Sequence, residues 1–442
     1  MSSSFRNGAL LAGAMLSGVL VAPGKAWASN WDFEPRVEVG ALYNDNYRLI
    51  EHNQPRVPAY GVLADVAMGF SLIDQRSELD FIPRVHSSFF PDDHEDQSTD
   101  GYVNIIGNFK TEKASYGGTF NYANETVLSS ELLPADFPGV NLGQTQGETN
   151  GRVTLHNRRQ LEQVAPKMTY DFTQRWHLDA NAMFENASFT NNITSNQTKQ
   201  YAQIGFKDIY GAAGAKYNLT QRQDITFRFN AGEFIPDKVT VLGTGPTATR
   251  VNTNTTNTER YGIEGLWEAK PSTTMQTYVR AGISQVHAST AVAGNINETL
   301  FVGGAGVIWS YQLSQYVVDA LRDVSPNSSG TVVTVDELRF RFLRALQPRL
   351  FGVLAARGIR TRGASQNILG VQGTDYAAVS ASLQYQITQS YRLAGEYGYT
   401  WQHFQGEPYA ASNGITVSVI WEPRSRFKPI PDFNALPLDR PQ

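Results

Sequence analysis

The densest run of side chains that could do chemistry is acidic. Asp92-Asp93-His94-Glu95-Asp96 places four carboxylates and an imidazole in five positions, and carboxylate oxygens are preferred ligands of hard divalent cations. The run could hold cations that bridge lipopolysaccharide, although a solvated loop tip has the same composition. The other histidines are scattered without the spacing of a metal-ligand set. We therefore expect no metal site and no cofactor.

No catalytic motif stands out either. Gly303-Gly304-Ala305-Gly306 resembles a phosphate-binding loop in composition, but it lies inside an alternating segment with no helix after it. Glycines in that setting predict a bulge or a close approach of strands. No serine or aspartate is paired with a histidine so as to single out a hydrolytic site, and we predict that the chain is not an enzyme.

The informative chemistry is a set of charged residues at every second position of extended segments. Phe340 and Phe342, for example, alternate with Arg339 and Arg341, and a period of two is that of a β-strand. Each such charge would cost several kcal/mol in an apolar core, whereas a water-filled lumen would keep it solvated. We expect a lumen lined by Glu78, Asp80, Arg84, His86, Asp179, Arg228, Glu264, Glu268, Arg280, Arg339, Arg341, Arg392 and Glu396.

Four copies of one pentapeptide mark turns between such segments. They begin at Tyr170, Tyr217, Tyr311 and Tyr385, and each ends in Thr-Gln or Ser-Gln. Repeated hairpins predict strands standing side by side, and in a membrane only a closed barrel leaves no unpaired strand edge. After the third copy the alternation breaks, and the register of the other copies would turn Asp319 towards lipid.

The connections predict the size of the barrel. Eight short turns alternate with nine long loops, a rhythm typical of outer-membrane barrels, and the strands are 10–15 residues long, longer than the ~5–6 residues usual in a soluble β-sandwich. We predict an all-β, transmembrane antiparallel β-barrel of about 18 strands. Sixteen or twenty also fit, because 148–172 is either one strand or a hairpin turning at 157–159. The long loops are expected at 44–57, 91–99, 124–149, 187–202, 235–258, 288–297, 324–332, 362–374 and 403–411.

The ends of the chain predict its route. Residues 1–28 read as a signal peptide, with Arg6, an apolar stretch and an Ala26-Trp27-Ala28 cleavage site; an N-terminal membrane anchor is the alternative. The barrel then covers 29–427, and 428–442 is a Pro-rich periplasmic tail that cannot add a strand. The chain has no cysteine and no run of 18 apolar residues, and loss of the signal peptide moves its net charge from −4 to −6. Nucleic acid is therefore not an expected partner.

Two segments carry resemblances. Ser412 to Trp421 resembles the C-terminal signal that the barrel-assembly machinery reads, although the chain continues beyond it. The start at 31–40, followed by Tyr43-Asn44-Asp45-Asn46-Tyr47, resembles outer-membrane β-barrel proteins found with exopolysaccharide biosynthesis clusters, as do the repeated turns. That resemblance implies passage of a secreted polysaccharide, with a periplasmic polysaccharide-export protein as partner, and transfers no catalytic residues.

These observations favour a non-catalytic conduit in the outer membrane of a Gram-negative cell. The expected surroundings are outer-membrane lipid and lipopolysaccharide, with both chain termini in the periplasm. A general or small-solute porin, a structural or adhesive barrel and a rim enzyme are the alternatives within the membrane. A soluble β-rich periplasmic protein is the alternative outside it.

Overall fold

The protein is a closed, 18-stranded antiparallel β-barrel. The computed structural model describes residues 30–56, 58–91, 97–127, 158–190, 204–237, 257–290, 294–327, 331–363 and 373–423. The strands are β1 (Asn30–Asn44), β2 (Ala59–Ile73), β3 (Ser77–Phe89), β4 (Ser98–Lys110), β5 (Ala114–Thr126), β6 (Arg158–Asp171), β7 (Trp176–Thr190), β8 (Phe206–Thr220), β9 (Gln223–Pro236), β10 (Thr258–Ser272), β11 (Met275–Thr290), β12 (Gly294–Tyr311), β13 (Ser314–Asn327), β14 (Thr331–Gln347), β15 (Leu350–Gly363), β16 (Thr374–Gln386), β17 (Tyr391–Phe404) and β18 (Ala410–Trp421).

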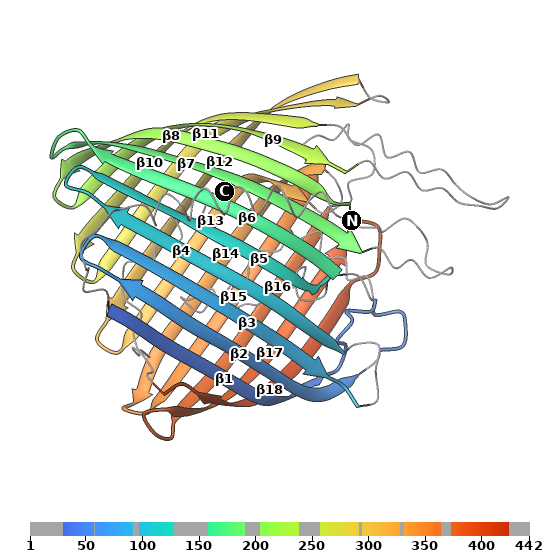
Figure 1. Ribbon diagram of the computed structural model, residues 1–442. Helices are drawn as coiled ribbons and strands as arrows, with labels where there is room; N and C mark the ends of the chain where they lie inside the picture. Colours follow the sequence, from blue (N-terminus) through green and yellow to red (C-terminus); the bar gives the residue numbers. More distant parts are fainter. Residues whose placement is uncertain are drawn as a thin grey trace, which may run out of the picture.

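Each strand pairs with its neighbours in sequence, and β1 closes the sheet against β18 (Figure 1). The closing register pairs residues 37–44 with residues 421–414. The predicted fold class and the count of 18 strands are therefore confirmed. In the uncertain stretch 148–172, β6 runs from Arg158 to Asp171, and 148–157 lie outside the described residues.

The seam between β1 and β18 is reinforced by the motif that follows β1. The side-chain amide of Asn46 is buried and donates to the backbone carbonyls of Ile50, at 2.8 Å, and Ala411, at 2.9 Å. The carboxylate of Asp45 accepts from the backbone N–H of Asn413 at 2.6 Å and from its side-chain amide at 2.8 Å. The Asn-Asp-Asn sequence thus fastens the first strand to the last.

The outward face of the barrel is apolar. Large hydrophobic side chains at alternate positions stay exposed, and the exposed aromatics Phe172, Trp176, Trp309, Tyr311, Tyr385 and Tyr391 lie beside the pentapeptide turns. An apolar band with aromatic girdles is the surface that a lipid bilayer requires of a transmembrane barrel. No helix among the described residues is long and apolar enough to cross a membrane.

Two expected long connections are wrong. Between β11 and β12 only residues 291–293 remain, and between β13 and β14 only 328–330, instead of 288–297 and 324–332. The reason is that the strands run further: β12 has 18 residues and β14 has 17. Near the ends of these strands, polar residues continue the backbone hydrogen bonding between strands. Their side chains can stay in water there because they lie beyond the apolar band of the outer face.

The expectation that Asp319 faces lipid is also wrong. In three pentapeptide copies the tyrosine pairs with the residue eight positions later, as Tyr170 pairs with Leu178. Tyr311 instead pairs with Ser314, three positions later, across a two-residue turn. An odd difference in register moves every following side chain to the other face. Asp319 therefore points inward and is buried.

Several predicted features lie outside the described residues. They are the cleavage-site residues Ala26 and Ala28, the acidic run 92–96 and the tail 428–442. Their assignments stay predictions.

Phe340 tests the assignment of the outward face. It lies between Leu338 and Phe342 on that side of β14. We expect Phe340→Arg to lower the free energy of unfolding by ~2–4 kcal/mol, the effect of an arginine near the bilayer midplane. Phe340→Leu keeps an apolar side chain against the lipid and should cost less than about 1.5 kcal/mol. Urea titrations of folding into phosphatidylcholine vesicles measure both, and equal stability of the two variants would contradict the assignment.

Candidate functional site

The candidate site is the polar inner face of the barrel, opposite the apolar outer face. Several charged side chains on this face pair with residues two strands away, across the strand that lies between them. The guanidinium of Arg228 in β9 donates to Asp179 of β7 at 3.1 Å, over β8. That of Arg280 in β11 donates to Asp323 of β13 at 3.2 Å, over β12. Contacts of this reach link strands that share no backbone hydrogen bonds.

These residues form one continuous ion-pair ladder. The carboxylate of Glu264 in β10 connects the Arg228–Asp179 pair to the Arg280–Asp323 pair. It accepts a hydrogen bond from the guanidinium of Arg280 at 2.7 Å and lies 3.5 Å from that of Arg228. The order around the wall is therefore Asp179, Arg228, Glu264, Arg280, Asp323. Each arginine of this ladder stands between two carboxylates, and two arginines against three carboxylates leave the ladder a formal charge of −1.

A second group surrounds Asp319. The carboxylate accepts from the phenol of Tyr278 and from the guanidinium of Arg339. Glu337 lies 3.7 Å from Arg339 and 2.7 Å from Arg357. The tyrosine can reach β13 because the intervening strand carries Gly306: a Cβ there would lie 2.4 Å from Cε1 of Tyr278. Glycine is thus required at this position for a close approach.

A third group joins β2 and β3. The buried carboxylate of Asp65 accepts from Nε of Arg84 at 2.8 Å, and Nδ1 of His86 lies 3.1 Å from the same oxygen. Arg84 also lies over the ring of Tyr102, with 5.4 Å between the guanidinium carbon and the ring centroid.

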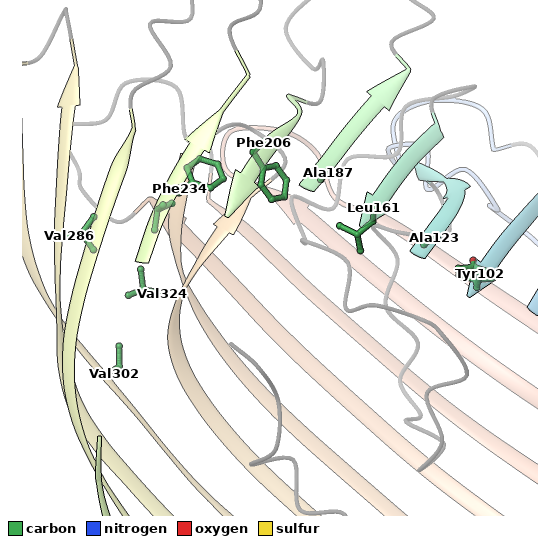
Figure 2. Packing of buried hydrophobic residues seen from close by; sticks show 10 residues of the cluster. Tyr102, Ala123, Leu161, Ala187, Phe206, Phe234, Val286, Val302 and Val324 are labelled. Atoms are coloured by element: carbon green, nitrogen blue, oxygen red, sulfur yellow. The ribbon is translucent and has the colours of Figure 1, made fainter. Parts of the chain in front are cut away.

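At the end where the long connections leave, the inner face carries an apolar collar. Figure 2 shows its side chains near the ends of the strands. Two buried ion pairs involve residues two positions from collar members, Arg159 from Leu161 and Asp208 from Phe206. Arg159 donates to Glu125 at 2.5 Å, and Arg260 forms a bidentate pair with Asp208 at 2.6 and 2.8 Å. The collar comprises Tyr102, Ala123, Leu161, Ala187, Phe206, Phe234, Val286 and Val302, and it is completed by Val324 and Val332 of the β13–β14 hairpin, whose register places them on the same side as Thr334.

The predicted lumen residues fall into two sets. Arg84, His86, Asp179, Arg228, Glu264, Glu268, Arg280, Arg339 and Arg392 enter ion pairs on the inner face, including Lys216 with Glu268 at 3.4 Å and Arg392 with Glu422 at 2.6 Å. The expectation that such charges are individually solvated is wrong for Glu264, Arg280, Arg339 and Arg392, which are buried. Glu78, Asp80, Arg341 and Glu396 are exposed or half-buried and lie apart from the ladder.

Sequence reasoning missed several members of these groups. Asp208, Arg260, Glu125 and Arg159 are all buried and paired. The signal was present for Arg260, because it lies four residues before Glu264 and the period of two continues through β10. Its partner in β8 could not be predicted, since the two residues are 52 positions apart and lie on strands that are not adjacent.

Within the described residues, the arrangement offers paired charges along a binding surface. Two histidines of the described strands contact carboxylates, His86 with Asp65 at 3.1 Å and His177 with Asp171 at 2.5 Å. In the described strands and turns, no three His, Asp or Glu side chains gather as a metal-ion site. What the inner face provides is a row of fixed, ion-paired donors and acceptors.

Comparison with known proteins adds likeness of fold. No protein-family model matches the sequence, and no curated protein matches it. Among solved structures, OmpTdeltaL8, an outer membrane protein of Vibrio cholerae, is 12% identical over 89% of this chain and 99% of its own (TM-score 0.38). OccK2 (OpdF) of Pseudomonas aeruginosa is 10% identical over 89% and 99% (TM-score 0.43). The copper transporter OprC is 8% identical over 91% and 68% (TM-score 0.47).

The pair of Asp319 and Arg339 should be strongly coupled. Arg339→Gln leaves a buried carboxylate without its cation, and we expect it to lower stability by ~3–5 kcal/mol. Asp319→Asn keeps an acceptor for Tyr278, so the double variant should recover most of the loss. A double-mutant cycle of urea unfolding in vesicles measures the coupling, and additive losses would mean that the pair contributes nothing.

The crossing over Gly306 gives a matched test. Gly306→Ala should lower stability by about 1–3 kcal/mol, because its methyl group would overlap the ring of Tyr278. Gly398→Ala is the control: it lies on the inner face of β17, where an added Cβ meets nothing within 4 Å. The same unfolding assay should show the control unchanged or slightly stabilised. A similar loss in both variants would contradict the proposed crossing.

Proposed function

We propose that this chain is a non-catalytic conduit of the outer membrane, whose polar inner face lines an aqueous passage. The observation that carries the proposal is the combination of a closed 18-stranded barrel with an apolar outer face and a charged, cross-paired inner face. Barrels of 16–18 strands are wide enough to leave a water-filled channel. In this arrangement the short turns and both ends of the chain lie in the periplasm.

The proposed cargo is a secreted polysaccharide. A hydrated sugar chain needs hydrogen-bond donors, acceptors and aromatic rings more than a net field, and the five charged side chains of the ladder leave a formal charge of only −1. Between the ion pairs, the inner face carries half-buried amide and hydroxyl side chains such as Asn121, Gln163, Asn181, Ser382 and Thr416. The resemblance at Tyr43–Tyr47 supports the same cargo, with a periplasmic polysaccharide-export protein as partner and the barrel-assembly machinery inserting the chain.

A small-solute porin is the second candidate, because the width that admits a sugar chain also admits small hydrophilic solutes. The two functions differ in what is lost with the gene. Glycosyltransferase and polysaccharide-export genes beside this one would favour export, and their absence would favour the porin.

Deletion separates the two candidates. We expect the deletion strain to secrete less exopolysaccharide while its uptake of small hydrophilic solutes is unchanged, and a plasmid copy should restore secretion. Secreted carbohydrate and the rate of antibiotic or sugar influx are measured in the same cultures. Normal secretion with reduced influx would replace export by the porin function.

A further inference from the structure

A row of charged residues interrupts the apolar outer face. Arg322 of β13, Asp336 of β14, Arg360 of β15 and Asp375 of β16 occupy successive cross-strand positions on the outward side. They share that side with Leu338, which is 57% exposed. Nε and Nη2 of Arg322 contact Asp336 at 2.5 and 2.8 Å, and Nε of Arg360 contacts Asp375 at 2.5 Å.

The height of the row places it at the edge of the apolar band. Arg360 lies ten residues from Leu350, the first residue of β15 on the side of the short turns. At about 3.3 Å per residue and a strand tilt of about 40°, the rise is about 25 Å, the height of the apolar band of an outer-membrane barrel. An outward arginine that costs ~2–4 kcal/mol at the midplane costs little at this level, where lipid phosphates lie.

The row has more arginines than its aspartates can neutralise. Arg362 follows on the same outward side, one step closer to the long connections and opposite Thr334. Three arginines against two carboxylates leave a net charge of +1. The side chains of Arg322 and Arg360 are 43% and 53% exposed. The aspartates hold the guanidinium groups through Nε, so the terminal nitrogens of Arg360 can face a ligand in a fixed orientation.

A depression lies next to the row. The depression forms where the outward residues are small, at Ala305, Ala320 and Gly358. The side chains of Phe301 and Trp401 also line it. The depression has a volume of about 780 Å³ and is also lined by the four charged residues of the row. A space of this size lies within the range of small-molecule sites, and it joins a cationic edge to an apolar floor.

We propose that this outer-wall site binds a phosphorylated glycolipid of the surrounding leaflet. The guanidinium groups of Arg322, Arg360 and Arg362 hold the phosphate, because guanidinium matches the geometry of phosphate oxygens. An acyl chain lies over Ala305, Ala320 and Gly358. The inference rests on the proposed membrane placement of the barrel and is independent of its cargo.

Native mass spectrometry of the purified full-length barrel tests the site, with diphosphorylated lipid A as the probe. The variant is Arg322→Gln/Arg360→Gln. The matched control is Arg344→Gln, an exposed outward arginine of β14 beside the short turns. We expect the double variant to weaken binding at least about tenfold, the loss of one charge-assisted contact or more, and the control to bind like the unchanged protein. Heat-modifiable migration on gels shows that each variant is folded.

Three outcomes would overturn the proposal. Equal weakening by Arg344→Gln would mean a general attraction of the lipid phosphates to any exposed arginine of the outer wall. Equal binding of dephosphorylated lipid A would remove the phosphate from the recognition. Displacement of the lipid by millimolar inorganic phosphate would make the site one for free phosphate. A barrel that fails these tests but still supports secretion keeps its proposed function, so the two failures are distinguishable.

Discussion

The structure depends on one constraint: inside a bilayer every backbone N–H and C=O must find a partner within the protein. Seventeen hairpin neighbours satisfy it for most of the sheet, and the pairing of β1 with β18 satisfies it for the last open edge. That seam joins residues at opposite ends of the chain, so it is the pairing with the largest loop-closure entropy to overcome. The hydrogen bonds of Asn46 and Asp45 to β18 stabilise the strand ends where the seam would otherwise fray.

Closure also decides the chemistry of the inner face. Once alternate side chains are committed to lipid, all others face the interior, and the charged ones need partners or water. The ladder from Asp179 to Asp323 meets this need by joining strands that share no backbone hydrogen bonds. Such pairs add little net stability after desolvation, but breaking one leaves an uncompensated buried charge. They therefore help to fix the relative heights of the strands as well as the charge of the wall.

Much of this was predictable from the sequence. The period of two assigned faces correctly along β14, where Arg339 is buried inside and Leu338 is exposed outside, and the turn rhythm predicted 18 strands. Two features of the structure cannot be predicted from the alternation of polar and apolar residues. A turn whose length changes by an odd number reverses the faces after it, as at Asp319. The shear of the barrel decides which residues of non-adjacent strands lie at the same level along the barrel axis. The pairing of Arg260 with Asp208, two strands away, therefore could not be predicted from the sequence.

The two faces use arginine in different ways, and the difference follows from what lies opposite them. Inside, Arg228 and Arg280 each stand between two carboxylates, which leaves a wall of alternating charges in which every cation is held on both sides and the formal charge is −1. Such a wall can hydrogen-bond an uncharged, hydrated polymer repeatedly without holding it at one point. Outside, Arg322 and Arg360 have one carboxylate each, and Arg362 adds a third cation. A surplus of positive charge at the edge of an apolar band favours a ligand that remains in place, and a phosphorylated lipid meets both the cation and the apolar surface beside it.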